Sequence, residues 1–143
     1  MNKRNIILIG MPGAGKSSVG VILAKVLGYE FIDTDLVIQH REKRLLREII
    51  ADEGNEGFLA IENEVNATLE ADKSVIAPGG SAIYGKEAME HFKEIGTIVY
   101  LKLSYEDLAK RLGNLKGRGV VLKEGQTLKD LYDERSKLYE QYA

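Results

Sequence analysis

The chain has 143 residues but no cysteine, and only two of its residues are histidines. The lack of cysteine excludes a disulfide scaffold, a cysteine-ligated zinc site and a cysteine nucleophile. The histidines, His40 and His91, lie far apart in the sequence and lack the spacing of metal ligands. Only two prolines interrupt the chain, and no linker, internal repeat or low-complexity tract stands out. One ordinary domain, residues 1–143, is therefore the expected organisation.

A large net charge and long apolar runs are also lacking. The formal net charge is −2, which does not favour a nucleic-acid-binding surface. No apolar run approaches the roughly 20 residues that span a bilayer. The apolar stretch near the N-terminus ends at a loop of glycine and lysine, not at a signal-peptide cleavage site. We therefore expect a cytoplasmic, monomeric protein that binds neither nucleic acid nor membrane.

Short apolar runs alternate with helical patterns along the chain. Runs typical of buried parallel strands lie at residues 5–9, 29–32, 74–77 and 97–101. Helical patterns lie at residues 16–27, 35–69, 85–95, 104–112 and 127–142, with glycines interrupting the second. The alternation predicts an α/β fold, a parallel β-sheet flanked by helices on both faces. Such sheets bind ligands at the carboxyl ends of their strands.

The first predicted helix, residues 16–27, has an amphipathic pattern. Val19, Ile22, Leu23 and Val26 recur at helical spacing and form one apolar face. Gly28 stands where a helix commonly ends in a left-handed residue. The pattern predicts a helix directly behind the loop that precedes it.

That loop, residues 10–17 (GMPGAGKS), fits the pattern G-x-x-x-x-G-K-[ST]. Its glycines let successive backbone N–H groups point into one concavity, which binds phosphate oxygens. Lys16 would reach the β- and γ-phosphates, and the Ser17 hydroxyl would bind magnesium. The alternative is a glycine turn with an accidental lysine, but the strand before the loop and the helix after it favour phosphate binding.

Two aspartates follow the second predicted strand. Asp33 and Asp35 stand two positions apart, so on extended chain both carboxylates point the same way. One carboxylate is suited to hold magnesium while the other meets an acceptor hydroxyl. The alternative role for Asp35 is that of a helix cap.

Glycines and basic residues mark the later loops. Gly79 and Gly80 follow the third predicted strand, where bare backbone allows a ligand to approach; a tight turn with positive φ is the alternative. The glycine-rich segment 113–126 predicts a lid. Arg111 and Arg118 lie beside or within it, and surface solvation is the alternative for them, as it is for Arg135.

These motifs together resemble the shikimate kinase family, which has a P-loop, nucleoside-monophosphate-kinase-like fold. The resemblance runs through nearly all of the chain, in the segments GMPGAGKSSVG (10–20), FIDTD (31–35), GFLAIENEV (57–65), PGGSA (78–82), TIVYL (97–101), RLGN with the later arginine (111–118) and ERSKLYEQYA (134–143). It implies a kinase that uses ATP and Mg²⁺ to phosphorylate a hydroxyl of shikimate or a related hydroxy acid. It also implies a step in aromatic amino acid biosynthesis.

The resemblance assigns roles to individual residues. It implies catalytic roles for Lys16, Asp35 and Arg118. It implies nucleotide contacts from Gly13, Ala14, Gly15, Lys16, Ser17, Ser18, Arg111 and Arg118. Acceptor contacts would come from Asp35, Gly79, Gly80 and Arg135, and magnesium would be held by Ser17 and Asp33. Residues 35–69 would form an acceptor-binding helical insert, and residues 113–126 the lid.

The chain departs from the family pattern in three places. Phe58-Leu59 stands where the family has Phe-Arg, whose arginine binds the acceptor carboxylate, although Glu62 is retained. Gly79-Gly80-Ser81 replaces three glycines, and Arg118-Gly119 replaces Arg-Pro. Two alternatives therefore stay open. One is a kinase for another small polyol or hydroxy acid, similar to gluconate kinases, and the other is an inactive nucleotide-binding regulatory protein.

Overall fold

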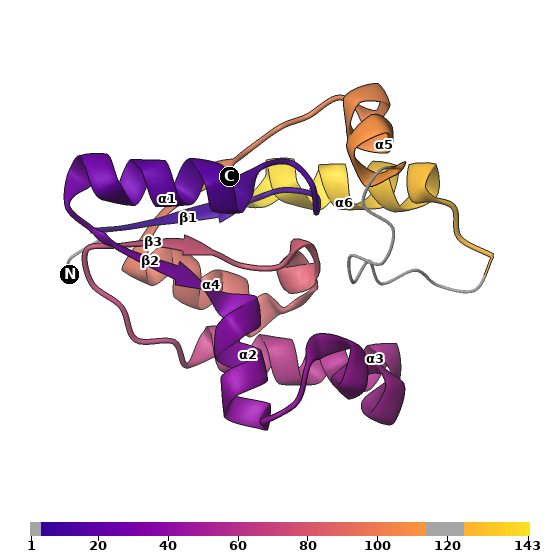
Figure 1. Ribbon diagram of the computed structural model, residues 1–143, viewed down its shortest axis with the longest axis horizontal. Helices are drawn as coiled ribbons and strands as arrows, with labels where there is room; N and C mark the ends of the chain where they lie inside the picture. The colour runs from indigo at the N-terminus through magenta and orange to yellow at the C-terminus, as the bar shows by residue number, and fades with distance from the viewer. Residues whose placement is uncertain (1–3, 114–124) are drawn as a thin grey trace.

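The computed structural model describes residues 4–113 and 125–143. Its core is a parallel sheet with the strand order β2-β3-β1-β4 (Figure 1). The strands are β1 (Asn5–Ile9), β2 (Glu30–Asp33), β3 (Ser74–Ala77) and β4 (Gly96–Tyr100). All three pairings are parallel. The four predicted strands are confirmed, each to within a residue at either end.

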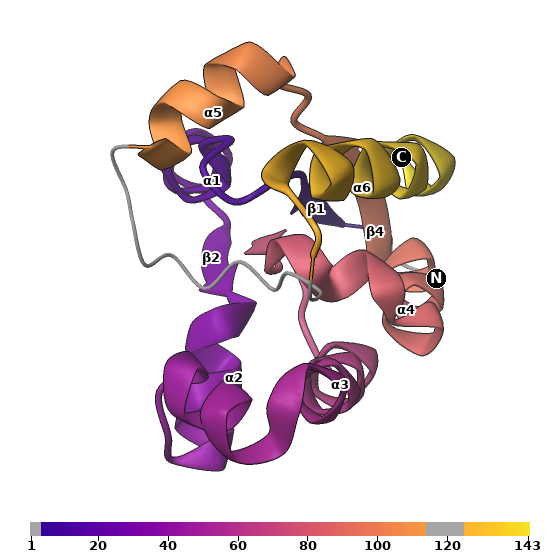
Figure 2. The ribbon, with the colours of Figure 1, turned by 90° about the vertical axis from the view of Figure 1, so that its right-hand side faces the viewer.

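Helices cover both faces of this sheet, as Figures 1 and 2 show. They are α1 (Lys16–Leu27), α2 (Thr34–Glu42), α3 (Leu46–Ala67), α4 (Lys86–Ile95), α5 (Tyr105–Gly113) and α6 (Leu128–Tyr142), with a 3₁₀ helix, η1 (Gly80–Tyr84), after β3. On one face, Ala24 of α1 packs on Leu8 and Val75. On the other, side chains of α4 and α6 such as Phe92 and Leu131 pack on the isoleucines of the strands. The predicted α/β class is confirmed.

The buried side of α1 differs from the apolar face in its sequence. Val19, Ile22 and Val26 are exposed, Val26 to 77%. The helix instead buries Gly20 and Ala24. A Cβ on Gly20 would lie 2.5 Å from the Phe31 ring, so the helix approaches the sheet through its smallest residues. The prediction of a helix at 16–27 is confirmed, but of its apolar face Leu23 packs against the core and the other three residues are exposed.

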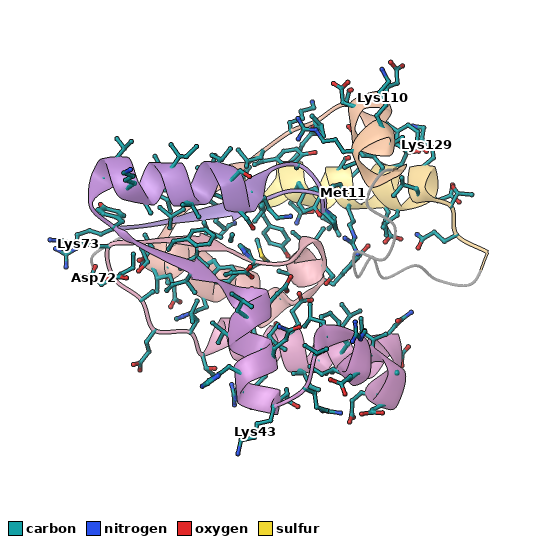
Figure 3. All side chains as sticks on the ribbon, viewed as in Figure 1. Met11, Lys43, Asp72, Lys73, Lys110 and Lys129 are labelled. Carbon is teal, nitrogen blue, oxygen red and sulfur yellow. The ribbon has the colours of Figure 1, made fainter. Side chains whose placement is uncertain are left out.

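The segment from residue 35 to 69 forms two helices that lie together at one end of the molecule (Figure 2). The first of them, α2, ends at Lys43, which has a left-handed φ of 56° and points away from the body (Figure 3). Gly54 has a φ of 74° and kinks α3, as its place in the sequence predicts, whereas Gly57 is helical. Gln39 holds the junction, because its side-chain oxygen accepts a hydrogen bond from the Leu46 N–H at 2.9 Å.

The last helix begins as predicted. Thr127 and Asp130 form a reciprocal capping box at the start of α6. Most of the predicted lid, including Arg118, lies in residues 114–124, outside the described residues. Across residues 4–113 and 125–143, none of the helices has the length and apolar character needed to cross a bilayer.

Candidate active site

A cleft of about 290 Å³ opens at the carboxyl ends of β1, β2 and β3. This is the edge at which the strand order predicts a ligand. Most of the residues singled out from the sequence meet there. The lining includes Gly13, Gly15, Lys16, Ser17, Ser18, Asp33, Asp35, Gly79, Gly80 and Arg135. Segments far apart in the chain therefore build one site.

The loop between β1 and α1 has the backbone of a phosphate cradle. Gly13 and Gly15 have φ values of 88° and 93°, which favour glycine. The Lys16 ammonium donates hydrogen bonds to the carbonyls of Gly10 at 2.5 Å and Met11 at 3.2 Å, so it is held over the loop. Met11 itself is buried where the loop faces α6 (Figure 3). The first turn of α1 follows directly, with N–H groups that lack intrahelical partners and suit an anion.

Arg111 reaches the same loop from α5. Its guanidinium donates a hydrogen bond to the Gly13 carbonyl at 3.1 Å. The Cβ that Gly15 lacks would lie 3.7 Å from the Arg111 guanidinium. Neither Arg111 nor Ala14 is among the residues that line the cleft.

The two aspartates after β2 have different local roles. Asp33 is the N-cap of α2, and its carboxylate accepts a hydrogen bond from the Asp35 N–H at 2.9 Å. The alternative of capping by Asp35 is therefore wrong, and so is a fully extended chain through this pair. Asp35 lies in the first turn of α2, and burial raises its pKa to about 6, with the Asp33 charge adding to the rise and Lys16 opposing it. Asp35 is thus a stronger base than an ordinary aspartate.

The glycines after β3 are needed because side chains from other parts of the chain come close to their backbone. Gly79 has a φ of −61°, so the alternative of a turn with positive φ is wrong at this position. A Cβ there would lie 2.8 Å from Asp35 Oδ1. A Cβ on Gly80 would lie 2.7 Å from Pro12 Cδ and 2.8 Å from Arg135 Nη1. Bare backbone thus lets three parts of the chain meet in the cleft.

Arg135 is only 1% exposed, so its alternative as a surface residue is wrong. Its guanidinium lies 5.5 Å from the centre of the Tyr84 ring. The Tyr139 hydroxyl, one turn later on α6, donates to the Gly80 carbonyl at 2.7 Å and fixes the helix against η1. A buried guanidinium that lines a cleft suits a carboxylate or a phosphate.

Sequence reasoning did not place Glu62 and Ser81 in the site. Glu62 is 1% exposed and lines the cleft, and its Oε1 accepts a hydrogen bond from the Ser81 hydroxyl at 2.7 Å. Burial raises the pKa of Glu62 to about 7, and the Asp35 charge adds to the rise. A signal was present, because Phe58, Glu62 and Val65 follow helical spacing and put the glutamate on the buried face.

Leu59 packs against the apolar cluster of α2 and α3 and does not line the cleft. The nearby arginines do not replace the missing guanidinium. Arg41 pairs with Glu64 at 3.1 Å, and Arg44 pairs with three acidic residues of α2 and α3. Among the described residues, Lys16 and Arg135 are the cations that line the cleft.

A parallel sheet with a phosphate loop after its first strand, an acidic pair after its second and glycines after its third defines a P-loop kinase for a small acceptor. The shikimate kinase family model matches residues 12–143. Shikimate kinase 2 of Yersinia enterocolitica is 34% identical over 98% of this chain and 83% of the relative. The chain belongs to the shikimate kinase family and is an ATP-dependent phosphotransferase with an alcohol group as acceptor.

Solved structures agree with this assignment. The shikimate kinase of Acinetobacter baumannii in complex with shikimate is 35% identical, with a TM-score of 0.85 over 97% of this chain and 79% of that chain. The shikimate kinase of Aquifex aeolicus is 31% identical, with a TM-score of 0.78 over 96% of this chain and 82% of that chain. The P-loop kinase fold is shared over nearly all of the chain.

Proposed function

We propose that this protein transfers the γ-phosphate of ATP to a hydroxyl of shikimate, with Mg²⁺ as the metal. The observation that carries the proposal is the convergence of Lys16, Asp35 and Arg135 on one cleft. These residues supply a phosphate-binding cation, a base and a carboxylate-binding cation. The shikimate bound in the Acinetobacter baumannii relative supports the choice of acceptor.

On the nucleotide side, the backbone of residues 13–18 and the Lys16 ammonium would bind the phosphates of ATP. Arg111 would lie at the outer side of the loop, near the base of the nucleotide. Arg118, the proposed catalytic lid cation, is outside the described residues. Phosphoryl transfer depends chiefly on positioning and charge neutralisation, which these groups would provide.

The residues present fit magnesium. Ser17 and Asp33 both line the cleft and offer a hydroxyl and a carboxylate oxygen, the ligands that Mg²⁺ prefers. Mg²⁺ usually takes only one or two protein ligands, with phosphates and waters completing its shell. A bound Mg²⁺ would neutralise charge on the transferred phosphate. The hydrogen bond from the Asp35 N–H holds the Asp33 carboxylate in place for that role.

On the acceptor side, Asp35 would take the proton of the reacting hydroxyl. Its raised pKa of about 6 suits a base that works near neutral pH. Arg135 would bind the acceptor carboxylate, and the bare backbone of Gly79 and Gly80 would let the ring approach. The α2 and α3 pair would form the acceptor-binding insert. We place this activity in the cytoplasm, in a monomer, without membrane or nucleic-acid partners.

A second acceptor class is favoured by one observation. Leu59 is apolar and packs in the cluster of α2 and α3. Among the described residues, the acceptor side of the cleft therefore has Arg135 as its cation, together with the carboxylates of Asp35 and Glu62. Such a lining also suits a neutral polyol or another hydroxy acid. An inactive regulatory protein is less well supported, because a nucleotide-binding module has no need of an acidic acceptor site.

The test is an ATP-consumption assay with shikimate, gluconate and related hydroxy acids, with phosphorus NMR of the product. Shikimate-dependent ADP formation with a new phosphate ester is expected. Preference for another acceptor would support the second candidate. Tight ATP binding without any acceptor-dependent turnover would support the regulatory protein. Ser104→Ala lies at the start of α5 and outside the cleft lining. It serves as the control variant and should use the same acceptor as the unmodified protein.

A further inference from the structure

The guanidinium of Arg135 lines the cleft as a buried charge that has no ion-pair partner among the described residues. Arg135 is 1% exposed, and its Nε has no hydrogen-bond partner there. Burial raises the pKa of Glu62 and the Arg135 charge opposes the rise, but the two side chains form no ion pair. A buried charge is costly unless other groups stabilise it. Another contact must therefore stabilise this guanidinium and hold it in the cleft.

The 3₁₀ helix η1 approaches the guanidinium with its first and its last residue. At the first residue, a Cβ on Gly80 would lie 2.8 Å from Arg135 Nη1, so bare backbone lies close to that nitrogen. At the last residue, the centre of the Tyr84 ring lies 5.5 Å from the guanidinium carbon, a distance typical of a cation–π contact. The planar, weakly hydrated guanidinium of arginine is well suited to lie on an aromatic face.

The Tyr84 ring is itself fixed by α6. Its hydroxyl donates a hydrogen bond to Oε2 of Glu134, the residue directly before Arg135. Burial raises the pKa of Tyr84, and the bond to Glu134 adds to the rise, so the hydroxyl keeps its proton. Tyr84 is half-buried and does not line the cleft. A tyrosine that only fills space there would not need this bond, because water could serve its hydroxyl.

We propose that Tyr84 is a positioning residue of the acceptor site: its ring holds the Arg135 guanidinium in the orientation that binds the acceptor carboxylate. The hydrogen bond to Glu134 fixes the ring in turn. A guanidinium that is already oriented loses less conformational freedom when the acceptor binds, so affinity for the carboxylate increases. This inference rests on the proposed function and adds to it the residue that orients its carboxylate-binding cation.

The test compares shikimate with its carboxamide, which keeps the hydroxyls but lacks the charge that Arg135 would bind. In the unmodified protein, shikimate should exceed the carboxamide by about 10- to 150-fold in kcat/KM, the value of one charge-assisted pair. Tyr84→Leu should lower this discrimination by about 2- to 30-fold, the value of a cation–π contact. It should raise the KM for shikimate more than it lowers kcat, with the KM for ATP unchanged. Tyr84→Phe keeps the ring and should keep most of the discrimination.

Tyr105→Leu is the matched control, since the Tyr105 ring also lies near a cation, 5.3 Å from the Lys129 ammonium, but outside the cleft lining. It should keep the full discrimination. Equal discrimination in the unmodified protein and Tyr84→Leu would overturn the inference while the proposed function stands, and so would an equal loss in Tyr84→Phe and Tyr84→Leu.

Thermal unfolding and ATP binding show whether each variant folds. If Tyr84→Leu does not fold, Tyr84→Met decides by the same criterion. Failure of both to fold would mean that the ring serves the core and not Arg135, which also overturns the inference. An unmodified protein that binds ATP but does not phosphorylate shikimate, or that uses the carboxamide equally well, would overturn the proposed function or its carboxylate contact, and this inference with it.

Discussion

The nucleotide half of the cleft comes from one continuous segment, whereas the acceptor half is assembled from four elements. Residues 10–18 supply the loop, the lysine and the first turn of α1. The acceptor half takes Asp35 from α2, Glu62 from α3, Gly79 to Ser81 from the turn after β3, and Arg135 from α6. Two of the three departures from the family pattern, Leu59 and Ser81, lie in or beside the acceptor half.

This difference has a physical reason. The phosphate cradle depends on backbone conformation within a few residues, so few substitutions are compatible with it. The acceptor half depends on which side chains meet through packing, so one exchange on α3 can be balanced by another on η1. The hydrogen bond that Ser81 of η1 donates to Glu62 of α3 is a contact of this assembled kind.

The largest effect is expected from Asp35→Asn in the acceptor half. The amide cannot take the proton of the acceptor hydroxyl, so kcat should fall by about 10²- to 10⁴-fold. ATP affinity should change little, because the proposed function assigns Asp35 to the acceptor and not to the nucleotide. Steady-state kinetics with calorimetric titration of ATP measures both. An equal collapse of ATP binding would move Asp35 to the metal and reverse the roles of the two aspartates.

The next largest effect is expected from Lys16→Ala in the nucleotide half. Loss of a charge-assisted contact worth about 2–3 kcal/mol should weaken ATP binding by about 30- to 150-fold and lower kcat/KM at least as much. Lys25→Ala, in the last turn of the same helix, is the control and should bind ATP normally. Normal activity of Lys16→Ala would refute the assignment of the phosphate loop.

The same contrast explains what could be predicted from the sequence. The strands and the phosphate loop were predictable because their signals are local: apolar runs, fixed glycines and a lysine. The packed face of α1 could not be predicted from its apolar pattern, since close approach to Phe31 requires Gly20 rather than a larger apolar residue. Periodicity counts apolar residues and does not show which side of a helix can come close to a sheet.

The acceptor half was predictable only in part. Asp35, Gly79 and Gly80 follow strands and so could be placed at the ligand-binding edge. Arg135 lies about a hundred residues from Asp35, and the polar residues around it in the sequence are typical of an exposed helix. Its burial results from the packing of α6 on η1 through the Tyr139 hydroxyl, a tertiary contact. The Ser81 and Glu62 pair has the same origin.

A smaller effect, and a gain, is expected from Leu59→Arg. A guanidinium three residues from Glu62 on α3 can pair with that carboxylate and reach an acceptor carboxylate. The KM for shikimate should fall by about 10- to 150-fold, the value of one charge-assisted pair. Leu59→Gln, polar but uncharged, is the control and should give little gain. A micromolar KM in the unmodified protein would instead show that another cation already serves the carboxylate.

The smallest effect concerns the stability of the protein without ligand. It arises from a carboxylate in the acceptor half of the cleft. Burial holds the pKa of Glu62 at about 7, above its ordinary value of 4.5. Between these values the folded protein binds more protons than the unfolded chain, so the free energy of unfolding falls as the pH rises and levels off above about 7. Asp35, Arg135, Lys16 and Ser81 face this carboxylate, and of these Asp35 strengthens the effect.

Glu62→Gln removes that titration without changing the shape of the side chain. Its melting temperature should therefore rise relative to the unmodified protein as the pH increases from about 4.5 to about 7, reaching a difference of several degrees. Thermal unfolding at a series of pH values measures it, and Glu64→Gln controls for the loss of a carboxylate from α3. A difference that is independent of pH would mean that Glu62 has the same protonation state in the folded and unfolded chain.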